Sequence, residues 1–405
     1  MQSPYSRKKD GIFNVLLCLF LFYYSYRYIF QYNSSTTSWT YQDTPIAFKV
    51  VKYVLLVILI IILAIQTRGR IRFSTRKRDQ YTLVAILFLI VQFLLLGVLT
   101  KNMDAIGIAV ILIPAVFFLT NRKGININHV ENVMILFWWF SFLYELVQLA
   151  LYVKTGRLPA LAEPNARFTD VRFGGAWDDP NGYALLMIFY VFYYLFKYQG
   201  IKQLAYVGAT LLMLISTWSA TGFIVFGATV LILLIIRLRD RKLIKKCLCY
   251  GLLATILVLA VFLMKREMIM DVLDHYLFKK DESVAAHMAG WNFSWLGLLT
   301  FLGIKPDYYI TEVGFLRLIS IGGIPALIAF CIISLNGCKL AIRCLAQSSK
   351  HKPILYGILA YIIGFILYNI NLPPIINFSC FGVFVLFISL LPGINKSSET
   401  TPSNA

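Results

Sequence analysis

The polar loop that leads into the sixth apolar run of the chain reads Arg167-Phe-Thr-Asp-Val-Arg172-Phe-Gly-Gly-Ala-Trp-Asp178-Asp179-Pro180-Asn181-Gly-Tyr-Ala184. The loop combines arginines, a glycine pair, acidic residues and a helix-start signal, and it runs directly into an apolar segment. The segments on both sides of it are long enough to cross a membrane. We therefore expect the loop to lie at a boundary between water and lipid, where a membrane-spanning helix begins.

The composition of the whole chain agrees with this placement. Hydrophobic residues make up 59% of the 405 residues and charged residues 14%, whereas globular domains have about 45–50% and about 25%. Apolar runs recur along the chain and leave no polar stretch long enough for a soluble domain of ordinary size. The sequence predicts an all-α fold: a polytopic integral membrane protein with a single transmembrane domain over residues 1–405.

The lengths of the apolar runs predict about twelve transmembrane helices. They are expected near residues 11–31, 46–66, 80–99, 104–120, 130–153, 180–196, 202–217, 221–236, 247–264, 313–335, 353–370 and 374–393. The boundary between the seventh and eighth helices is the least distinct, because the two apolar runs nearly fuse.

Basic residues predict the orientation of these helices. Lysine and arginine gather in residues 1–10 and in the second, eighth and tenth connections, whereas residues 32–45 and 371–374 contain neither. Cytoplasmic loops carry the excess of Lys and Arg, so both termini are expected in the cytoplasm. The formal net charge of +19 is then explained by the basic loops on the cytoplasmic side of the membrane. No nucleic-acid partner is expected.

This orientation places the two longest loops, residues 154–179 and 265–312, on the extracytoplasmic side. Both contain basic residues, among them Arg266, which work against the orientation rule. A function for these residues is therefore expected, although long loops also cross membranes largely regardless of their charge. The Ser/Thr-rich segment 396–405 is expected to be a disordered cytoplasmic tail.

Several classes of site are not indicated by the sequence. It contains no P-loop, no Gly-rich dinucleotide turn, no nucleophile elbow and no pair of metal ligands at helical spacing. The cysteines fall inside apolar runs or at their basic ends, which does not favour a disulfide framework or a zinc site. We expect neither a metal nor a cofactor.

The opening loop has the composition of an anion site. Arg167 and Arg172 precede a helix start, and a guanidinium beside a helix N-terminus suits phosphate oxygens. Backbone N–H groups approach closely at glycines. The predicted ligand is a phosphate or pyrophosphate, and the substrate-binding candidates are Arg167, Gly174, Gly175, Asp178, Asp179 and Asn181. Asp179-Pro180 also has a purely structural interpretation as a helix cap.

The second long loop supplies further candidates. Glu312 lies where the tenth span begins, and it is expected either to cap that helix or to act as a general base. Trp291 is a candidate for stacking on a sugar ring, and Arg266 for substrate binding. Away from the ends of the predicted spans, Glu145 is the only acid, and a charge at that depth normally faces a cavity or a partner. Arg317 is its predicted partner and a further substrate-binding candidate.

The motif Arg172-x-x-Gly175-x-x-x-Asp179-Pro180-Asn181-x-x-Ala184 resembles the signature of the bacterial O-antigen ligase and polymerase superfamily. The layout of about a dozen spans with two outer loops is similar as well. Gly303-Ile and the run Glu312-x-Gly-Phe-Leu-x-x-x-x-x-x-Gly322-Gly-Ile look like the family's second conserved block. The resemblance covers residues 130–335 and depends mostly on the first motif.

The resemblance implies a membrane enzyme that uses undecaprenyl-pyrophosphate-linked glycans on the outer leaflet, without a metal and with inversion. Arg172 would hold the donor pyrophosphate, and Glu312 would activate the acceptor hydroxyl at a position where ligases often have His. His287 lies four residues before the loop's Trp, here Trp291, where the family often has an Arg. It is a catalytic candidate, although a lone histidine is more often a polar surface residue than a catalyst. The junction Ser219-Ala220-Thr221-Gly222 also departs from the family, since it lacks an Arg.

We therefore expect a polysaccharide polymerase, an inverting glycosyltransferase that extends O-antigen of lipopolysaccharide, capsule or exopolysaccharide. It would lie in the bacterial cytoplasmic (inner) membrane, with membrane lipid, a chain-length regulator and a flippase as further partners. The alternatives are an O-antigen ligase and, from another class, a lipid-linked glycan flippase. A flippase would favour internal repeats and a polar central cavity, and the sequence shows neither clearly.

Overall fold

The computed structural model describes residues 46–67, 77–120, 127–155, 162–164, 171–175, 177, 179–236, 296–304, 313–347 and 351–399. Helices make up 87% of this part of the chain, which confirms the all-α class. The predicted first and ninth spans, residues 11–31 and 247–264, lie outside the described residues. Each of the other predicted spans overlaps a helix, although the bounds differ; the span predicted over 313–335 corresponds to a helix that continues to Gln347.

The described elements occur in the following order along the chain. They are α2 (Ile46–Thr67), α3 (Lys77–Thr100), α4 (Met103–Thr120), α5 (Ile127–Thr155), β1 (Ala162–Pro164), β2 (Val171–Phe173), α6 (Pro180–Lys197), α7 (Gly200–Ser216), α8 (Ala220–Ile236), α12 (Leu298–Phe301), α13 (Gly314–Gln347), α14 (Lys352–Tyr368) and α15 (Phe378–Glu399). The last helix extends into the predicted tail, whose residues 400–405 are outside the description.

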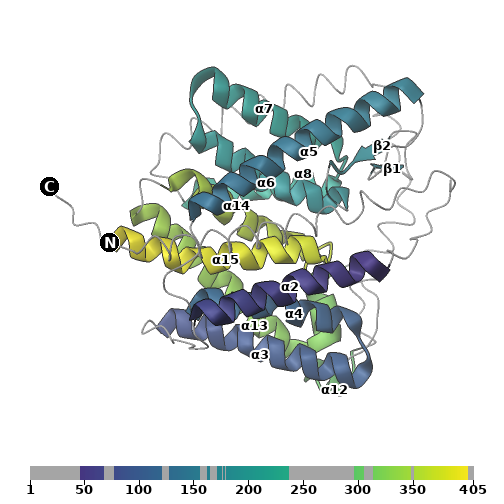
Figure 1. Cartoon of the computed structure of the whole chain (residues 1–405), viewed down its shortest axis with the longest axis vertical. Helices are drawn as coiled ribbons and strands as arrows, with labels where there is room; N and C mark the ends of the chain where they lie inside the picture. The colour runs from purple at the N-terminus through teal and green to yellow at the C-terminus, as the bar shows by residue number, and fades with distance from the viewer. Residues whose placement is uncertain are drawn as a thin grey trace.

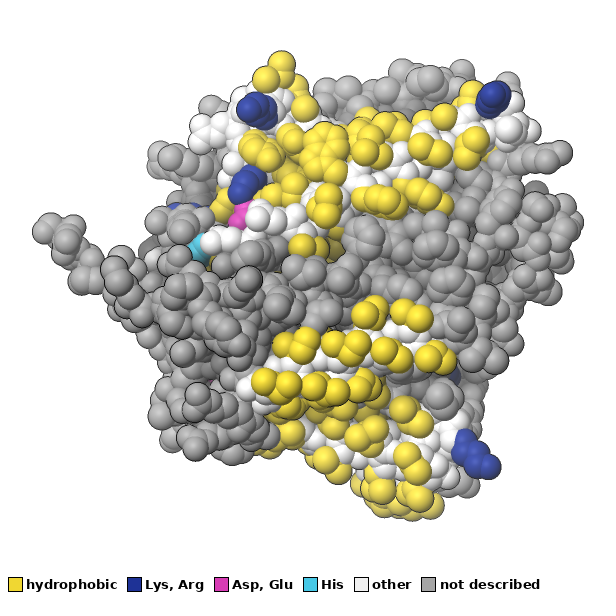
Figure 2. Space-filling model, in the orientation of Figure 1, with side chains coloured by type: hydrophobic (Ala, Val, Ile, Leu, Met, Phe, Trp, Pro, Cys, Tyr) yellow, Lys and Arg dark blue, Asp and Glu magenta, His cyan; other side chains and the backbone are white. Residues whose placement is uncertain are grey.

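Three of the described helical segments are long and apolar enough to cross a membrane, namely Asp79–Thr100, Val130–Thr155 and Gly314–Gln347, and several shorter apolar helices accompany them. The chain is therefore a membrane protein. Hydrophobic side chains form two patches on the visible surface, one over α5 and α7 and one over α2 and α3 (Figure 2). Apolar side chains of α5 and α3, such as Leu143 and Leu95, are exposed, as expected of surfaces that face lipid.

The helices lie side by side in a bundle in which α5 to α8 form one part and α2 to α4, α12 and α13 the other (Figure 1). Helix α6 is central: its side chains are buried without interruption from Gly182 to Leu195. A helix that is covered on all faces belongs to the core. Helix α14 packs closely against it at Gly357, where a Cβ would lie 2.7 Å from Phe189 Cε2.

Helix α13 is broken where it meets the short helix α12. Gly323 has φ 70° and ψ −175°, a conformation that favours glycine. A Cβ on Gly323 would lie 2.3 Å from the backbone nitrogen of Gly303, and Gly303 itself has φ 74°. The Gln92 side-chain amide donates to Gly322 O at 2.5 Å. The break lets the α12 turn cross the helix with backbone against backbone.

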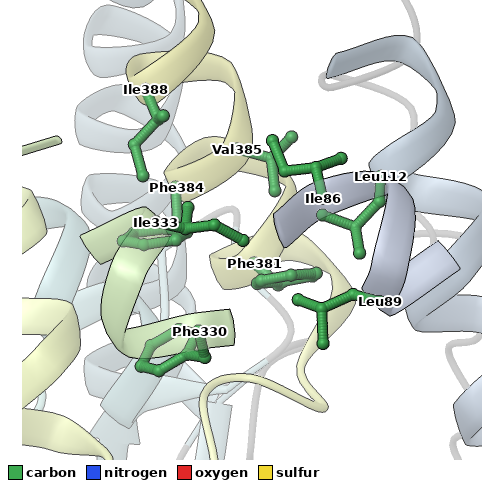
Figure 3. A pocket seen from close by; sticks show the side chains of 9 residues that line it. All are labelled: Ile86, Leu89, Leu112, Phe330, Ile333, Phe381, Phe384, Val385 and Ile388. Atoms are coloured by element: carbon green, nitrogen blue, oxygen red, sulfur yellow. The ribbon is translucent and has the colours of Figure 1, made fainter. Parts of the chain in front are cut away.

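The part of the bundle that contains α13 has an apolar interior. A small pocket opens between α3, α4, α13 and α15 (Figure 3). Its lining is entirely apolar and consists of Ile86, Leu89, Leu112, Phe330, Ile333, Phe381, Phe384, Val385 and Ile388.

A short hairpin occupies the first long loop. β1 and β2 pair antiparallel, with Glu163 opposite Arg172. The hairpin lies at the end of the bundle where α5 ends and α6 begins (Figure 1). The Phe173 ring packs edge-on against Tyr152 of α5, with centroids 6.2 Å apart. This contact fixes the strand that carries Arg172.

Candidate functional site

Arg172 lies on β2 and reaches across to two other segments. Its Nε donates to the Thr217 carbonyl oxygen at 2.9 Å, and its Nη2 donates to Asn181 Oδ1 at 2.8 Å. The side chain is half-buried. Because a guanidinium is planar, two bonds from different nitrogens fix its orientation as well as its position. Arg172 thus joins the hairpin, the start of α6 and the turn between α7 and α8.

The start of α6 confirms the predicted helix cap. Asp179 Oδ1 accepts from the backbone N–H of Asn181 and Asp179 Oδ2 from that of Gly182, both at 3.0 Å, and Pro180 occupies the first helical position. Burial raises the pKa of the Asp179 carboxyl, although these amides and the Arg172 guanidinium act in the opposite direction. Asp179 takes the first amides of the helix, and Arg172 brings a positive charge to the same end.

The turn between α7 and α8 contributes residues that sequence reasoning did not include in the site. Ser219 Oγ donates to Asn181 Oδ1 at 2.8 Å and accepts from the backbone N–H of Gly222 at 3.0 Å. Trp218, in the same turn, has φ 47°. Asn181 Oδ1 therefore accepts from both Arg172 and Ser219. The available signal was the polar junction Ser219-Ala220-Thr221-Gly222 between two apolar runs.

The glycine pair has a packing role in this structure. Gly174 O accepts from the backbone N–H of Trp177 at 2.9 Å, which closes a turn after β2. Gly175 has φ 54°, and a Cβ there would lie 2.4 Å from Tyr183 Cζ. Trp177 is buried and meets Phe137 edge-on, with ring centroids 5.6 Å apart. The glycines allow the loop to fold onto the first turn of α6.

Glu145 of α5 lies behind this loop. Its Oε2 accepts from the Tyr183 hydroxyl at 3.1 Å, and its Oε1 accepts from Ser216 Oγ at 2.6 Å. The predicted pairing of Glu145 with Arg317 is wrong, because these two hydroxyls are its partners. Spacing along a sequence does not reveal which helices become neighbours, and α6 and α7 rather than α13 lie beside α5 at this depth (Figure 1).

The start of α13 is tied to the same end of the bundle. The backbone N–H of Phe315 donates to Asn369 O at 3.1 Å, at the end of α14. Asn371 Nδ2, after α14, donates to Thr221 Oγ1 in the first turn of α8 at 3.0 Å. Arg317 is half-buried on the first turns of α13. These bonds link the helix that carries Arg317 to the helix that follows the Arg172 cluster.

The described residues bring together part of the predicted site. Arg172, Gly174, Gly175, Asp179 and Asn181 form one cluster, and Arg317 lies on another helix. The other candidates lie outside the described residues, so their places in the site remain predictions; they are Arg167, Asp178, Arg266, His287, Trp291 and Glu312. Within the described part of the chain, no three His, Cys, Asp or Glu side chains gather as metal ligands would.

Neither a protein-family model nor a curated protein sequence matches the chain. The resemblance of its motifs to the O-antigen ligase and polymerase superfamily therefore contributes to a proposal, together with the geometry around Arg172.

Proposed function

We propose that the chain is a polysaccharide polymerase that joins undecaprenyl-pyrophosphate-linked oligosaccharide units at the outer face of the bacterial cytoplasmic membrane. The observation that carries the proposal is the placement of Arg172. Its guanidinium is held by Thr217 O and Asn181 Oδ1 at the end of a membrane bundle. A fixed, permanently charged planar group at that position suits a pyrophosphate at the membrane surface.

The proposed reaction is an inverting glycosyl transfer. The acceptor hydroxyl oxygen attacks the anomeric carbon of the donor and forms the new glycosidic bond. The bond between that carbon and the pyrophosphate oxygen breaks, and its electron pair leaves with undecaprenyl pyrophosphate. The hydroxyl proton passes to a general base, for which Glu312 is the candidate.

Arg172 would act on the leaving group in this reaction. Negative charge grows on the bridging oxygen as the anomeric bond breaks, and a fixed cation stabilises it without reorganisation. Two unit charges about 4 Å apart interact by about 4 kcal/mol at an effective dielectric constant near 20. A preference of even half this size for the transition state changes the rate by more than about tenfold.

The proposed orientation follows from the basic loops. It places the Arg172 end of the bundle outside and the end of α15 in the cytoplasm. Lipid-linked glycan and surrounding lipid would then be the partners in contact with the site, with a flippase supplying the units and a regulator setting chain length. The product would be O-antigen, capsule or exopolysaccharide.

The substitution Arg172→Ala tests the proposal in cells. We expect loss of long surface polysaccharide on gels, with single units retained on the carrier or core, and partial recovery with Arg172→Lys. Arg343→Ala is the matched control, because Arg343 is an exposed arginine near the other end of α13. Long polysaccharide in the Arg172→Ala strain, with normal amounts of protein in the membrane, would show that the proposal is wrong.

Purified protein distinguishes the polymerase from the other two functions. With lipid-linked repeat units alone, a polymerase makes longer chains and releases undecaprenyl pyrophosphate. A ligase requires a lipid acceptor for that release, and its loss leaves long chains stranded on the carrier. A flippase moves the units across the bilayer and releases no pyrophosphate.

A further inference from the structure

Glu145 contacts both segments that hold the Arg172 loop, although it does not touch Arg172. On one side it accepts from Ser216 Oγ at 2.6 Å. Ser216 is the last residue of α7, and the next residue, Thr217, supplies the carbonyl that accepts from Arg172 Nε. A shift of Ser216 therefore moves the acceptor of the guanidinium directly.

On the other side Glu145 accepts from the Tyr183 hydroxyl at 3.1 Å. The Tyr183 ring lies against Gly175, since a Cβ at Gly175 would be 2.4 Å from Tyr183 Cζ. Gly175 is in the turn that directly follows β2, the strand of Arg172. Tyr183 is also in the first turn of α6, close to Asn181, the second acceptor of the guanidinium.

We propose that Glu145 is a positioning residue that holds Arg172 in place through Ser216 and Tyr183. This role rests on the proposed function, in which Arg172 stabilises the leaving pyrophosphate and must therefore be held in one position. The two oxygens of one carboxyl group can accept from two hydroxyls at the same time. The Glu145 carboxyl group of α5 thus holds both the end of α7, through Ser216, and the first turn of α6, through Tyr183.

Substitutions of Glu145 and of its two partners separate this role from others. Glu145→Ala removes both contacts. Glu145→Gln keeps an acceptor and supplies an amide donor, and a tyrosine or serine hydroxyl accepts as well as donates. Tyr183→Phe and Ser216→Ala each remove one hydroxyl. Ser141→Ala is the matched control on α5, because the buried Ser141 hydroxyl has no hydrogen-bond partner among the residues that the structure describes.

The first measurement reports on Arg172 and requires no activity. Full-length protein in lipid nanodiscs is treated with phenylglyoxal, and the labelling rate of the Arg172 peptide is followed by mass spectrometry. We expect faster labelling in Glu145→Ala and, to a smaller extent, in Tyr183→Phe and Ser216→Ala. Glu145→Gln and Ser141→Ala are expected to label at the wild-type rate. Unchanged labelling in Glu145→Ala would overturn the proposal.

The second measurement is release of undecaprenyl pyrophosphate from lipid-linked repeat units. Small displacements of a catalytic group cost up to about a hundredfold in rate, so we expect Glu145→Ala to lower kcat by about ten- to a hundredfold. Recovery by Glu145→Gln would show that no charge or proton transfer at this position is needed. Glu145→Ala combined with Arg172→Ala is expected to be no slower than Arg172→Ala alone.

Failures of the two proposals look different. If wild-type protein releases no pyrophosphate but Glu145→Ala speeds Arg172 labelling, the proposed function fails and the positioning role stands. If release is robust and Glu145→Ala leaves the labelling rate unchanged, the positioning role fails. Should Glu145→Ala not fold, Tyr183→Phe and Ser216→Ala decide the question, and wild-type labelling in both would overturn it.

Discussion

The Arg172 end of the bundle and the interior between α3, α4, α13 and α15 are held together by different forces. At the Arg172 end, β2, α6 and the α7–α8 turn are joined by hydrogen bonds that meet at Asn181 Oδ1. Around the pocket in the interior, the contacts are between apolar side chains (Figure 3). Apolar contacts depend on volume and tolerate small shifts, whereas hydrogen bonds fix directions. The first region is suited to orienting a charge and the second to holding helices together.

The largest expected effect follows from removing the shared acceptor. Asn181→Ala leaves Arg172 Nη2 and Ser219 Oγ without the oxygen that both of them contact. We expect the release of undecaprenyl pyrophosphate to fall about a hundredfold, which corresponds to about 2.7 kcal/mol. Asn336→Ala is the matched control in the other region, since Asn336 Nδ2 donates to Thr82 Oγ1 at 3.2 Å. Equal losses in the two variants would remove the distinction between the regions.

The next effect tests the backbone crossing at the break in α13. Gly323→Ala puts a Cβ 2.3 Å from Gly303 N at a φ of 70°. We expect the free energy of unfolding to fall by about 2–3 kcal/mol, measured by denaturation in mixed SDS micelles. A matched substitution is Gly208→Ala on α7, where no atom of the described part of the chain is found within 4 Å of the added Cβ. That variant should be as stable as the wild type, and a stable Gly323→Ala protein would contradict the assigned crossing.

A smaller loss of stability is expected in the apolar interior. Leu112 is 1% exposed and lines the pocket. Lipid is as apolar as the core, so little free energy is gained by moving a leucine side chain from lipid into the protein. Leu112→Ala should therefore lower the free energy of unfolding by about 1–2 kcal/mol, through lost packing. The labelling rate of Arg172 should stay at the wild-type value. A change in that rate would show that the two regions are coupled.

The smallest effect is expected near the other end of α6. Lys197 pairs with Glu131, which also accepts from the Tyr193 hydroxyl at 2.7 Å. The lysine is partly exposed, and such ion pairs contribute about 0–1 kcal/mol. Lys197→Met should therefore change the denaturation midpoint only slightly and leave pyrophosphate release unaffected. A large loss of activity would mean that polar contacts at both ends serve the site.

Most helices were predictable because their apolar runs have the length that a membrane requires. The start of α6 was predictable from Asp179-Pro180, since capping is a local property of the chain. The strands were not, because Ala162–Pro164 and Val171–Phe173 are too short to show an alternating pattern. The break in α13 was also missed, because its glycine needs the α12 turn beside it.

The candidate site was predictable only in its first motif. Arg172 and Asn181 stand in one stretch of sequence, so their proximity followed from a short loop entering a helix. The approach of Thr217 and Ser219 depends on where α7 ends in space, and the partners of Glu145 depend on which helices become neighbours. Both are properties of the packed bundle, which a single sequence does not specify by spacing.

The burial of α6 from Gly182 to Leu195 has a consequence for how the protein is made. Helix α14 packs against α6 at Phe189. In the chain, however, α7, α8 and α13 all lie between α6 and α14. Membrane helices insert first and pack afterwards. Helix α6 therefore cannot complete its packing until its later partner, α14, has been synthesised and inserted. The contacts that orient Arg172 include Asn181 in the first turn of α6. They therefore reach their final arrangement only after synthesis has passed Tyr368. A chain that ends before α14 would carry every residue of the motif without the framework that orients it.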